Sequence, residues 1–151
     1  MRLLKRVCLL LISIWATIAT NAQETFFPVS DGETARYTTE IGINDAAITG
    51  ILILKRQDGN LAGTLMNEFG IKAFDFTRKK EGKIKLLNVI DMMDKWYIRY
   101  TLKRDLRFLL DNADKAEGYK KGKREIRHEE NGGITLYNKK RKITYRLRPI
   151  Q

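Results

Sequence analysis

Cysteine and histidine are almost absent from the chain, which has one of each, Cys8 and His128, among 151 residues. Cys8 lies at the start of the apolar N-terminal run and follows Val7, whereas a lipid-modified cysteine comes after such a run and follows a small residue. With no second cysteine there is no disulfide, so an exported domain would depend on its own core. His128 has no second ligand or nucleophile to form a metal site or a Cys/His dyad, and it is typical of a surface histidine. We therefore expect no lipid anchor, no disulfide, no metal and no cofactor.

Linkers rich in proline, glycine or serine, internal repeats and low-complexity tracts are also absent, so one domain is expected. The stretches "DGETARY" and "ENGG" do not lead from a strand into a helix with the glycines and lysine that a phosphate-binding loop requires. Four aspartates, Asp91, Asp94, Asp105 and Asp111, are placed for helix capping and surface ion pairs rather than as catalytic carboxylate pairs. The sequence thus predicts a protein that is not an enzyme, with a small hydrolase as a distant alternative.

The N-terminus has the layout of a secretory signal peptide. A basic start, "MRLLKR", precedes the apolar run "VCLLLISIWATIA", and small residues lead to Gln23. The run is too short and wrongly flanked for a comfortable membrane span, although an uncleaved anchor is the alternative. We predict that residues 1–22 are a signal peptide cleaved after Ala22, that the protein is exported, and that residues 23–151 form a single domain.

Positive charge dominates what remains. The formal net charge is +11 for the whole chain, and it falls to +8 without the basic residues of the signal peptide. The basic residues concentrate in "KKGKREIRHEE" and "NKKRKITYRLR". For an exported protein these runs favour anionic lipid headgroups or polysaccharide over nucleic acid. The alternative is a solvated strand face that keeps the protein soluble.

Alternation of apolar and polar residues predicts strands before and after a single helix. The helix is expected within residues 92–111, where Ile98, Leu102, Leu106, Leu109 and Leu110 recur at helical spacing, although "WYIRYTL" also alternates like a strand. Strands followed by one helix and more strands favour an antiparallel α+β domain with the helix packed on the sheet. The predicted strands are 36–40, 46–57, 61–66, 71–79, 83–90, 123–129, 134–138 and 143–150.

The strand at 46–57 is apolar on both faces. Ile48, Leu52 and Leu54 share one face, and Ile51 and Ile53 share the other. A half-exposed antiparallel strand would alternate with polar residues, so this pattern indicates two apolar environments. Either the strand is central and buried on both sides, or one face borders a cavity filled by acyl chains.

Three aromatic residues, Trp96, Tyr97 and Tyr100, come near the start of the predicted helix. They suit a cavity mouth or a membrane interface, where amphipathic rings are favoured, or else they belong to the core.

A hairpin joins residues 61–66 to 71–79 through Asn67-Glu68-Phe69-Gly70, which fits a type I turn. Phe69 then projects from the tip and leaves apolar area in water unless a partner covers it. Gly63 is expected to leave room beneath Phe74. The predicted cross-strand pairs are Met66 with Ile71, Leu65 with Lys72, Gly63 with Phe74 and Leu61 with Phe76, which gather Leu61, Leu65, Phe74 and Phe76 on one face.

The run "LMNEFGIKAFDF…EGKIKLL" resembles the central hairpin of the outer-membrane lipoprotein receptor (LolB-like) proteins, which share a fold with the periplasmic lipoprotein carrier (LolA-like). In the receptor, a turn of the pattern Asn-Pro-Leu-Gly joins two apolar strands and directs its leucine outward. Asn67, Phe69 and Gly70 match this pattern, and Glu68 stands in place of the proline. The resemblance covers roughly residues 46 to 110.

The resemblance implies a curved, unclosed antiparallel sheet, half-barrel-like, with one main helix on or across it, and an apolar cavity that accepts acyl chains. It implies a periplasmic lipid or lipoprotein carrier, including association with the outer membrane, that touches an anionic membrane surface through the turn Asn67, Phe69 and Gly70. The alternative is a structural or interaction module of the cell envelope with a filled core and a basic surface. The expected cavity residues are Ile48, Leu52, Leu54, Leu61, Leu65, Phe74, Phe76 and Trp96.

Overall fold

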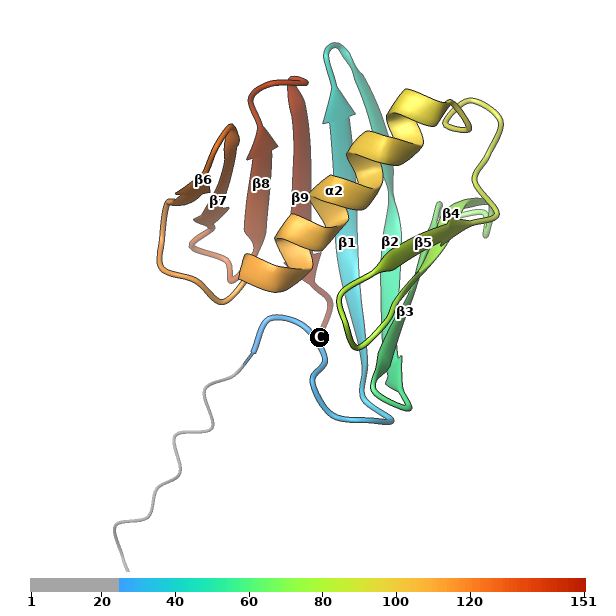
Figure 1. Ribbon diagram of the computed structural model, residues 1–151, viewed down its shortest axis with the longest axis vertical. Helices are drawn as coiled ribbons and strands as arrows, with labels where there is room; N and C mark the ends of the chain where they lie inside the picture. Colours follow the sequence, from blue (N-terminus) through green and yellow to red (C-terminus); the bar gives the residue numbers. More distant parts are fainter. Residues whose placement is uncertain (1–24) are drawn as a thin grey trace, which may run out of the picture.

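The computed structural model describes residues 25–151, so the predicted signal peptide and its cleavage position after Ala22 lie outside the described residues. Among these residues, one sheet of nine strands runs in the order β5-β4-β3-β2-β1-β9-β8-β7-β6, and one helix, α2, crosses it (Figure 1). All neighbouring strands are antiparallel. Because β5 and β6 remain as edges, the sheet is an open half-barrel, and the predicted α+β class is confirmed.

The strands agree with the predicted ones in most of their extent. The predicted strands 46–57 and 134–138 have the bounds expected of them. The strand predicted at 36–40 is longer in the structure, and the strand predicted at 83–90 is shorter. One short edge strand, Tyr119–Lys121, was not predicted because three residues between glycine turns carry no alternation. The strands are β1 (Thr34–Ile43), β2 (Ala46–Gln57), β3 (Asn60–Met66), β4 (Lys72–Arg78), β5 (Ile84–Leu87), β6 (Tyr119–Lys121), β7 (Arg124–His128), β8 (Ile134–Asn138) and β9 (Ile143–Pro149).

Helix α2 (Trp96–Asn112) lies across the concave face of the sheet (Figure 1). Leu102, Leu106 and Leu109 form its buried stripe, as their spacing predicts. The ambiguous segment "WYIRYTL" is helical. Within residues 25–151, no helix is long and apolar enough to cross a membrane.

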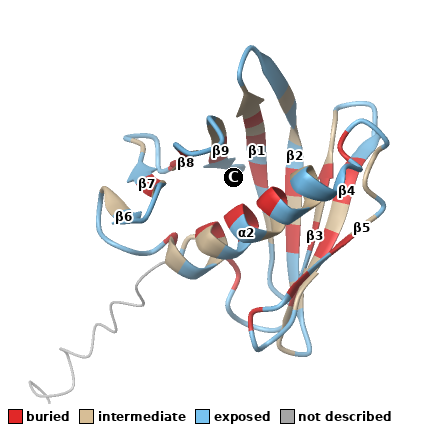
Figure 2. Ribbon diagram, turned by 45° about the horizontal axis from the view of Figure 1, so that its top comes forward, coloured by how far each residue is buried: buried red, intermediate tan, exposed pale blue. Residues whose placement is uncertain are grey.

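The core lies between α2 and the concave face, where the buried positions of the strands and the helix face one another (Figure 2). Leu54, Phe74 and Phe76 on the strands are at most 1% exposed, and Leu109 on the helix is equally buried. On the convex face, Ile51 is 37% exposed and no element among the described residues covers it. The expectation of two apolar environments is therefore wrong, because only the concave face of β2 is covered.

The hairpin of β3 and β4 has a register two residues away from the predicted one. Leu65 pairs with Phe74 and Gly63 pairs with Phe76. The turn itself forms as expected, with Gly70 N–H donating to the Asn67 carbonyl oxygen at 3.0 Å, but a bulge next to Leu65 and a longer loop closure shift the pairing. A shift of two keeps every side chain on its predicted face.

Gly63 therefore makes room for the ring of Phe76, not for Phe74. A Cβ atom on Gly63 would overlap the Phe76 ring and lie 2.9 Å from Leu54 Cδ2. The Phe76 ring thus lies close to the β3 backbone at Gly63.

Candidate functional site

An apolar groove of about 290 Å³ lies between the first half of α2 and the adjacent ends of β1 and β9. Ile43 pairs with Ile143 and Ile41 pairs with Tyr145, so the alternation of the two strands places all four on the concave face. Helix α2 contributes residues one turn apart, on the face that lines the groove. The apolar lining consists of Ile41, Ile43, Met93, Ile98, Leu102 and Ile143, and Tyr97, Thr101, Arg141 and Tyr145 complete it.

The predicted cavity residues lie elsewhere. None of the eight predicted residues lines the groove. Six of them are at most 4% exposed and belong to the hydrophobic core: Leu52, Leu54, Leu61, Leu65, Phe74 and Phe76. Ile48 is half-buried against the same core. Trp96 is 80% exposed at the start of α2 and is separated from the other seven. Sequence reasoning missed the groove because its wall comes from β1, β9 and α2, whereas the resemblance directed attention to β2, β3 and β4.

The aromatic residues at the start of α2 are exposed, so the interpretation of these rings as core is wrong. Tyr97 is 48% exposed and Tyr100 is 52% exposed. Tyr97 borders the groove and makes an edge-to-face contact with Trp96, with ring centroids 5.9 Å apart. One exposed amphipathic ring, Tyr97, thus lines the groove, and Trp96 packs against it.

Phe69 is 79% exposed at the tip of the β3–β4 hairpin. Asn67 Oδ1 accepts hydrogen bonds from the backbone N–H groups of Phe69 and Ile71, at 3.0 and 2.9 Å, and Gly70 adopts a φ of +77°. Asn67 and Gly70 therefore shape the turn, and Phe69 is left in solvent as predicted.

The loop before α2 lies beside this hairpin, because Ile90 N–H donates to the Ala73 carbonyl oxygen at 2.9 Å. From there the loop leads to the start of the helix (Figure 1). Four large side chains along this path, here called the apolar rim, are between 62% and 80% exposed: Phe69, Ile71, Met92 and Trp96.

A second, smaller pocket of about 150 Å³ shares Thr101 and Arg141 with the apolar groove. It opens between the middle of α2 and the turns that precede β7 and β9. Tyr100 borders it, with the Arg104 guanidinium 5.4 Å above its ring centroid. Its cationic lining, here called the basic pocket, consists of Arg104, Lys123, Arg124, Lys140 and Arg141.

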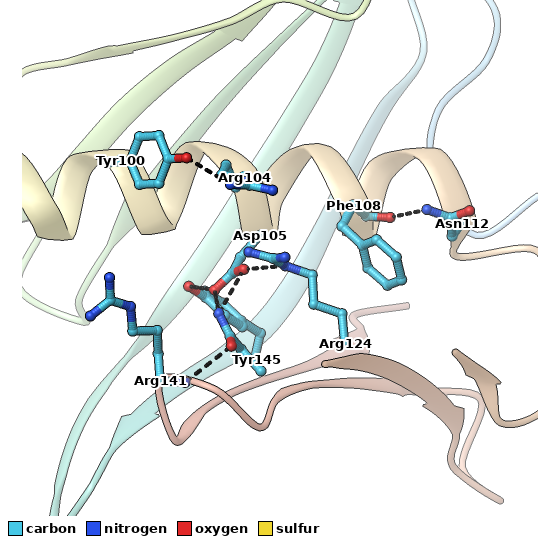
Figure 3. A network of polar contacts seen from close by, with 9 residues as sticks. Tyr100, Arg104, Asp105, Phe108, Asn112, Arg124, Arg141 and Tyr145 are labelled. Carbon is cyan, nitrogen blue, oxygen red and sulfur yellow. Dashed lines mark hydrogen bonds and ion pairs between the residues drawn. The ribbon is translucent and has the colours of Figure 1, made fainter. Parts of the chain in front are cut away.

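Asp105 lies behind the basic pocket and is fully buried, so its predicted role in capping or a surface ion pair is wrong. Arg124 Nε donates to Asp105 Oδ1 at 2.6 Å, and the Tyr145 hydroxyl donates to Oδ2 at 2.8 Å (Figure 3). Asn138 Nδ2 lies 2.9 Å from both oxygens. The helical spacing from Leu102 to Asp105 to Leu109 was the available signal, since it puts the carboxylate in the buried stripe.

This network satisfies a charge that would otherwise be costly to bury. Burial and the Asp105 charge hold the pKa of Tyr145 well above its usual range, so its hydroxyl remains a donor at neutral pH. The network ties α2 to β7, β8 and β9 and fixes Arg124 and Tyr145, which line the basic pocket and the groove respectively.

The remaining singled-out residues lie at the surface. Asp94 pairs with Arg99 at 2.7 Å, and Asp111 pairs with Arg78, which confirms the surface ion pairs expected of these two aspartates. His128 is exposed and its Nε2 lies 2.9 Å from the Ala113 carbonyl oxygen. In the part of the chain that the structure describes, no three His, Cys, Asp or Glu side chains gather as a metal site.

No protein-family model matches this chain, and no curated protein matches it significantly.

Proposed function

We propose that this chain is an exported, non-enzymatic carrier that binds acyl chains of lipids or lipoproteins and meets the membrane through the Phe69 turn. The apolar groove is the observation that carries the proposal. It is lined mainly by aliphatic side chains and by the half-exposed ring of Tyr97, which suits a hydrocarbon chain entering from a membrane interface. The signal-peptide pattern of residues 1–22 supports export.

The size of the groove sets the scale of the ligand. Ligand pockets commonly enclose roughly 300–1,000 Å³, and this groove, at about 290 Å³, falls at the lower limit. It suits part of one acyl chain rather than the several chains of a lipoprotein. Each methylene group that leaves water contributes roughly 0.8 kcal/mol before ordering costs, so a partly buried chain would bind reversibly. Reversible binding is what transfer requires.

The apolar rim supports the second half of the proposal. Phe69 has no covering partner among residues 25–151, and full burial of such a side chain is worth about 2 kcal/mol. Insertion of the rim into an interface would bring the start of α2, and with it the groove mouth, to the membrane. Basic side chains would then meet anionic headgroups.

The likeness to the LolB-like receptors and the LolA-like carrier remains part of this proposal. The open half-barrel with a helix across it is consistent with that family, and the exposed phenylalanine corresponds to its outward leucine. On this basis the protein acts in the periplasm and at the outer membrane, with acyl chains and an anionic membrane surface as its partners.

A structural or interaction module of the cell envelope is the second candidate. It is favoured by the packing of the predicted cavity residues into a filled core, which leaves the half-barrel itself without an open interior under β2, β3 and β4. Such a module would need no ligand, and its basic surface would act alone.

Lipid extraction and native mass spectrometry of the purified protein test the carrier proposal. We expect co-purified acyl species and uptake of an added acyl probe. Ile43→Trp should fill the groove and lower uptake, because Ile43 is part of its wall. Ile53→Trp is the matched control, since Ile53 is similarly half-buried but lies on the convex face. A clean apo protein without acyl uptake, or equal uptake by the two variants, would contradict the proposal.

A further inference from the structure

The basic pocket has more positive charge than the surrounding protein neutralises. Arg124 is paired with Asp105, but no salt bridge among residues 25–151 involves Arg104, Lys123, Lys140 or Arg141. The described chain has many ion pairs elsewhere, including Glu125 with Lys139 at 2.6 Å and Glu129 with Arg148 at 3.0 Å. Cations left without counterions around one small concavity form a site of positive potential that attracts an anion.

The geometry of the pocket is partly fixed in advance. Asp105 holds Arg124 through Nε, so the terminal nitrogens of that guanidinium remain available to an incoming anion. The Tyr100 hydroxyl accepts a hydrogen bond from Arg104 at 2.6 Å, and this contact orients Arg104 beside the same pocket. Figure 3 shows these two arginines and Arg141 around the Asp105 network. Guanidinium groups held in this way lose less freedom on binding an oxyanion.

The apolar groove and the basic pocket meet at Thr101 and Arg141, which line both. A ligand that fills the groove with a hydrocarbon chain would therefore place its polar end beside Arg141. Resting on the function proposed above, we infer that the ligand is a single-chain amphiphile with a phosphate monoester headgroup, bound with its chain in the groove and its phosphate in the basic pocket.

Charge favours phosphate over carboxylate as the headgroup. A phosphate monoester carries a charge of about −1.5 to −2 at neutral pH and three acceptor oxygens. It can therefore form ion pairs with several cations at once, whereas a carboxylate carries one negative charge and two acceptor oxygens. Four cations without a carboxylate partner match the more highly charged group.

Binding of dodecyl phosphate, dodecanoate and dodecanol, each below its micelle concentration, tests this inference by titration calorimetry. The site variant is Arg104→Gln, Lys123→Gln, Lys140→Gln, because these three side chains line the basic pocket and not the groove. The control variant, Arg36→Gln, Lys55→Gln, Lys85→Gln, removes the same charge from exposed residues on the convex face that have no salt bridge within the described chain. Circular dichroism checks that both variants fold.

We expect the native protein to bind dodecyl phosphate more tightly than dodecanoate, and dodecanoate more tightly than dodecanol. The site variant should weaken dodecyl phosphate binding about tenfold and leave dodecanol binding within about twofold, whereas the control variant should change neither. Added salt should weaken binding of dodecyl phosphate most and of dodecanoate less, and it should leave dodecanol binding unchanged.

Three results would overturn the inference. If dodecanol and dodecyl phosphate bind equally well and the site variant has no effect, the headgroup site is wrong while the carrier proposal stands. If the control variant loses as much phosphate binding as the site variant, general charge and not the pocket is responsible. If none of the three amphiphiles binds, both the inference and the carrier proposal fail.

Discussion

Phe69 lies in a well-defined turn, yet the fold does not bury its side chain. The Asn67 side chain and Gly70 specify the turn, and the phenylalanine between them gains nothing from the fold because four-fifths of its surface is in water. The fold gives no reason for this apolar exposure, and we propose that a partner covers it.

Replacing Phe69 with glutamate should weaken binding to anionic vesicles severalfold and change the free energy of unfolding by less than about 0.5 kcal/mol. On the proposed function, Phe69 would contact the membrane, and it is not part of the core. Vesicle co-sedimentation and urea unfolding provide the two measurements. Val29→Glu is the control, because Val29 is also largely exposed, at 59%, but lies in the segment before β1, away from the rim. A large loss of stability would instead show that Phe69 is a structural residue.

Asp105 shows what the residue scale could and could not predict. Its spacing to Leu102 and Leu109 places it in the buried stripe, which is visible in the sequence. The hydrogen-bond partners of Asp105 are not visible in the sequence, because Arg124, Asn138 and Tyr145 come from three strands that only the topology brings together.

At the scale of elements, hydrophobic alternation predicted most strands and the position of α2, because each is a local pattern. The register of strand pairing was harder to predict from the sequence. The β3–β4 pairing depends on a bulge and on how Asn67 closes the loop, and neither leaves a mark in the apolar pattern, since a shift of two residues preserves the faces. The edge strand β6 is too short to alternate at all.

Gly63 provides a test of this register. Gly63→Ala should destabilise the protein by about 1–3 kcal/mol, because the added methyl group would overlap the buried Phe76 ring. Gly42→Ala, on β1, is the control, since a Cβ there meets no atom within 4 Å; it should be neutral or stabilising. Denaturant unfolding measures both. If the two variants unfold alike, Phe76 does not pack over Gly63.

On the convex face, Glu125 of β7 makes a pH-dependent contribution to the stability of the fold. Hydrogen bonds from Lys139 and Arg127 lower its pKa from 4.5 to about 2. Because the folded pKa is depressed, the contribution is complete above about pH 4.5 and is lost as the pH falls toward about 2.

Glu125→Gln should therefore reduce stability at neutral pH and make it fall less steeply between pH 4.5 and 2. Urea unfolding across this range measures the slope. Glu130→Gln is the control, because Glu130 is exposed and forms no salt bridge with residues 25–151. An unchanged slope in Glu125→Gln would show that the ion pairs do not form in solution.

At the scale of the whole molecule, the open half-barrel was expected from the resemblance, but its interior was not correctly assigned. The large side chains of β2, β3 and β4 fill their own part of the concave face. The open space occurs where the isoleucines of β1 and β9 face the first half of α2, between segments about 100 residues apart in the chain. A cavity that depends on such distant segments follows from topology and not from any local pattern.

The central claim is that an acyl chain occupies this groove, and photo-crosslinking tests it most directly. The protein is irradiated with a fatty acyl probe that carries a diazirine along its chain, and the labelled peptides are identified by mass spectrometry. The account predicts labels within residues 41–43, 93–102 and 141–145, which compete with unlabelled acyl chains and decrease in Ile43→Trp. Labels spread over the convex face, or labelling that no unlabelled chain displaces, would contradict it.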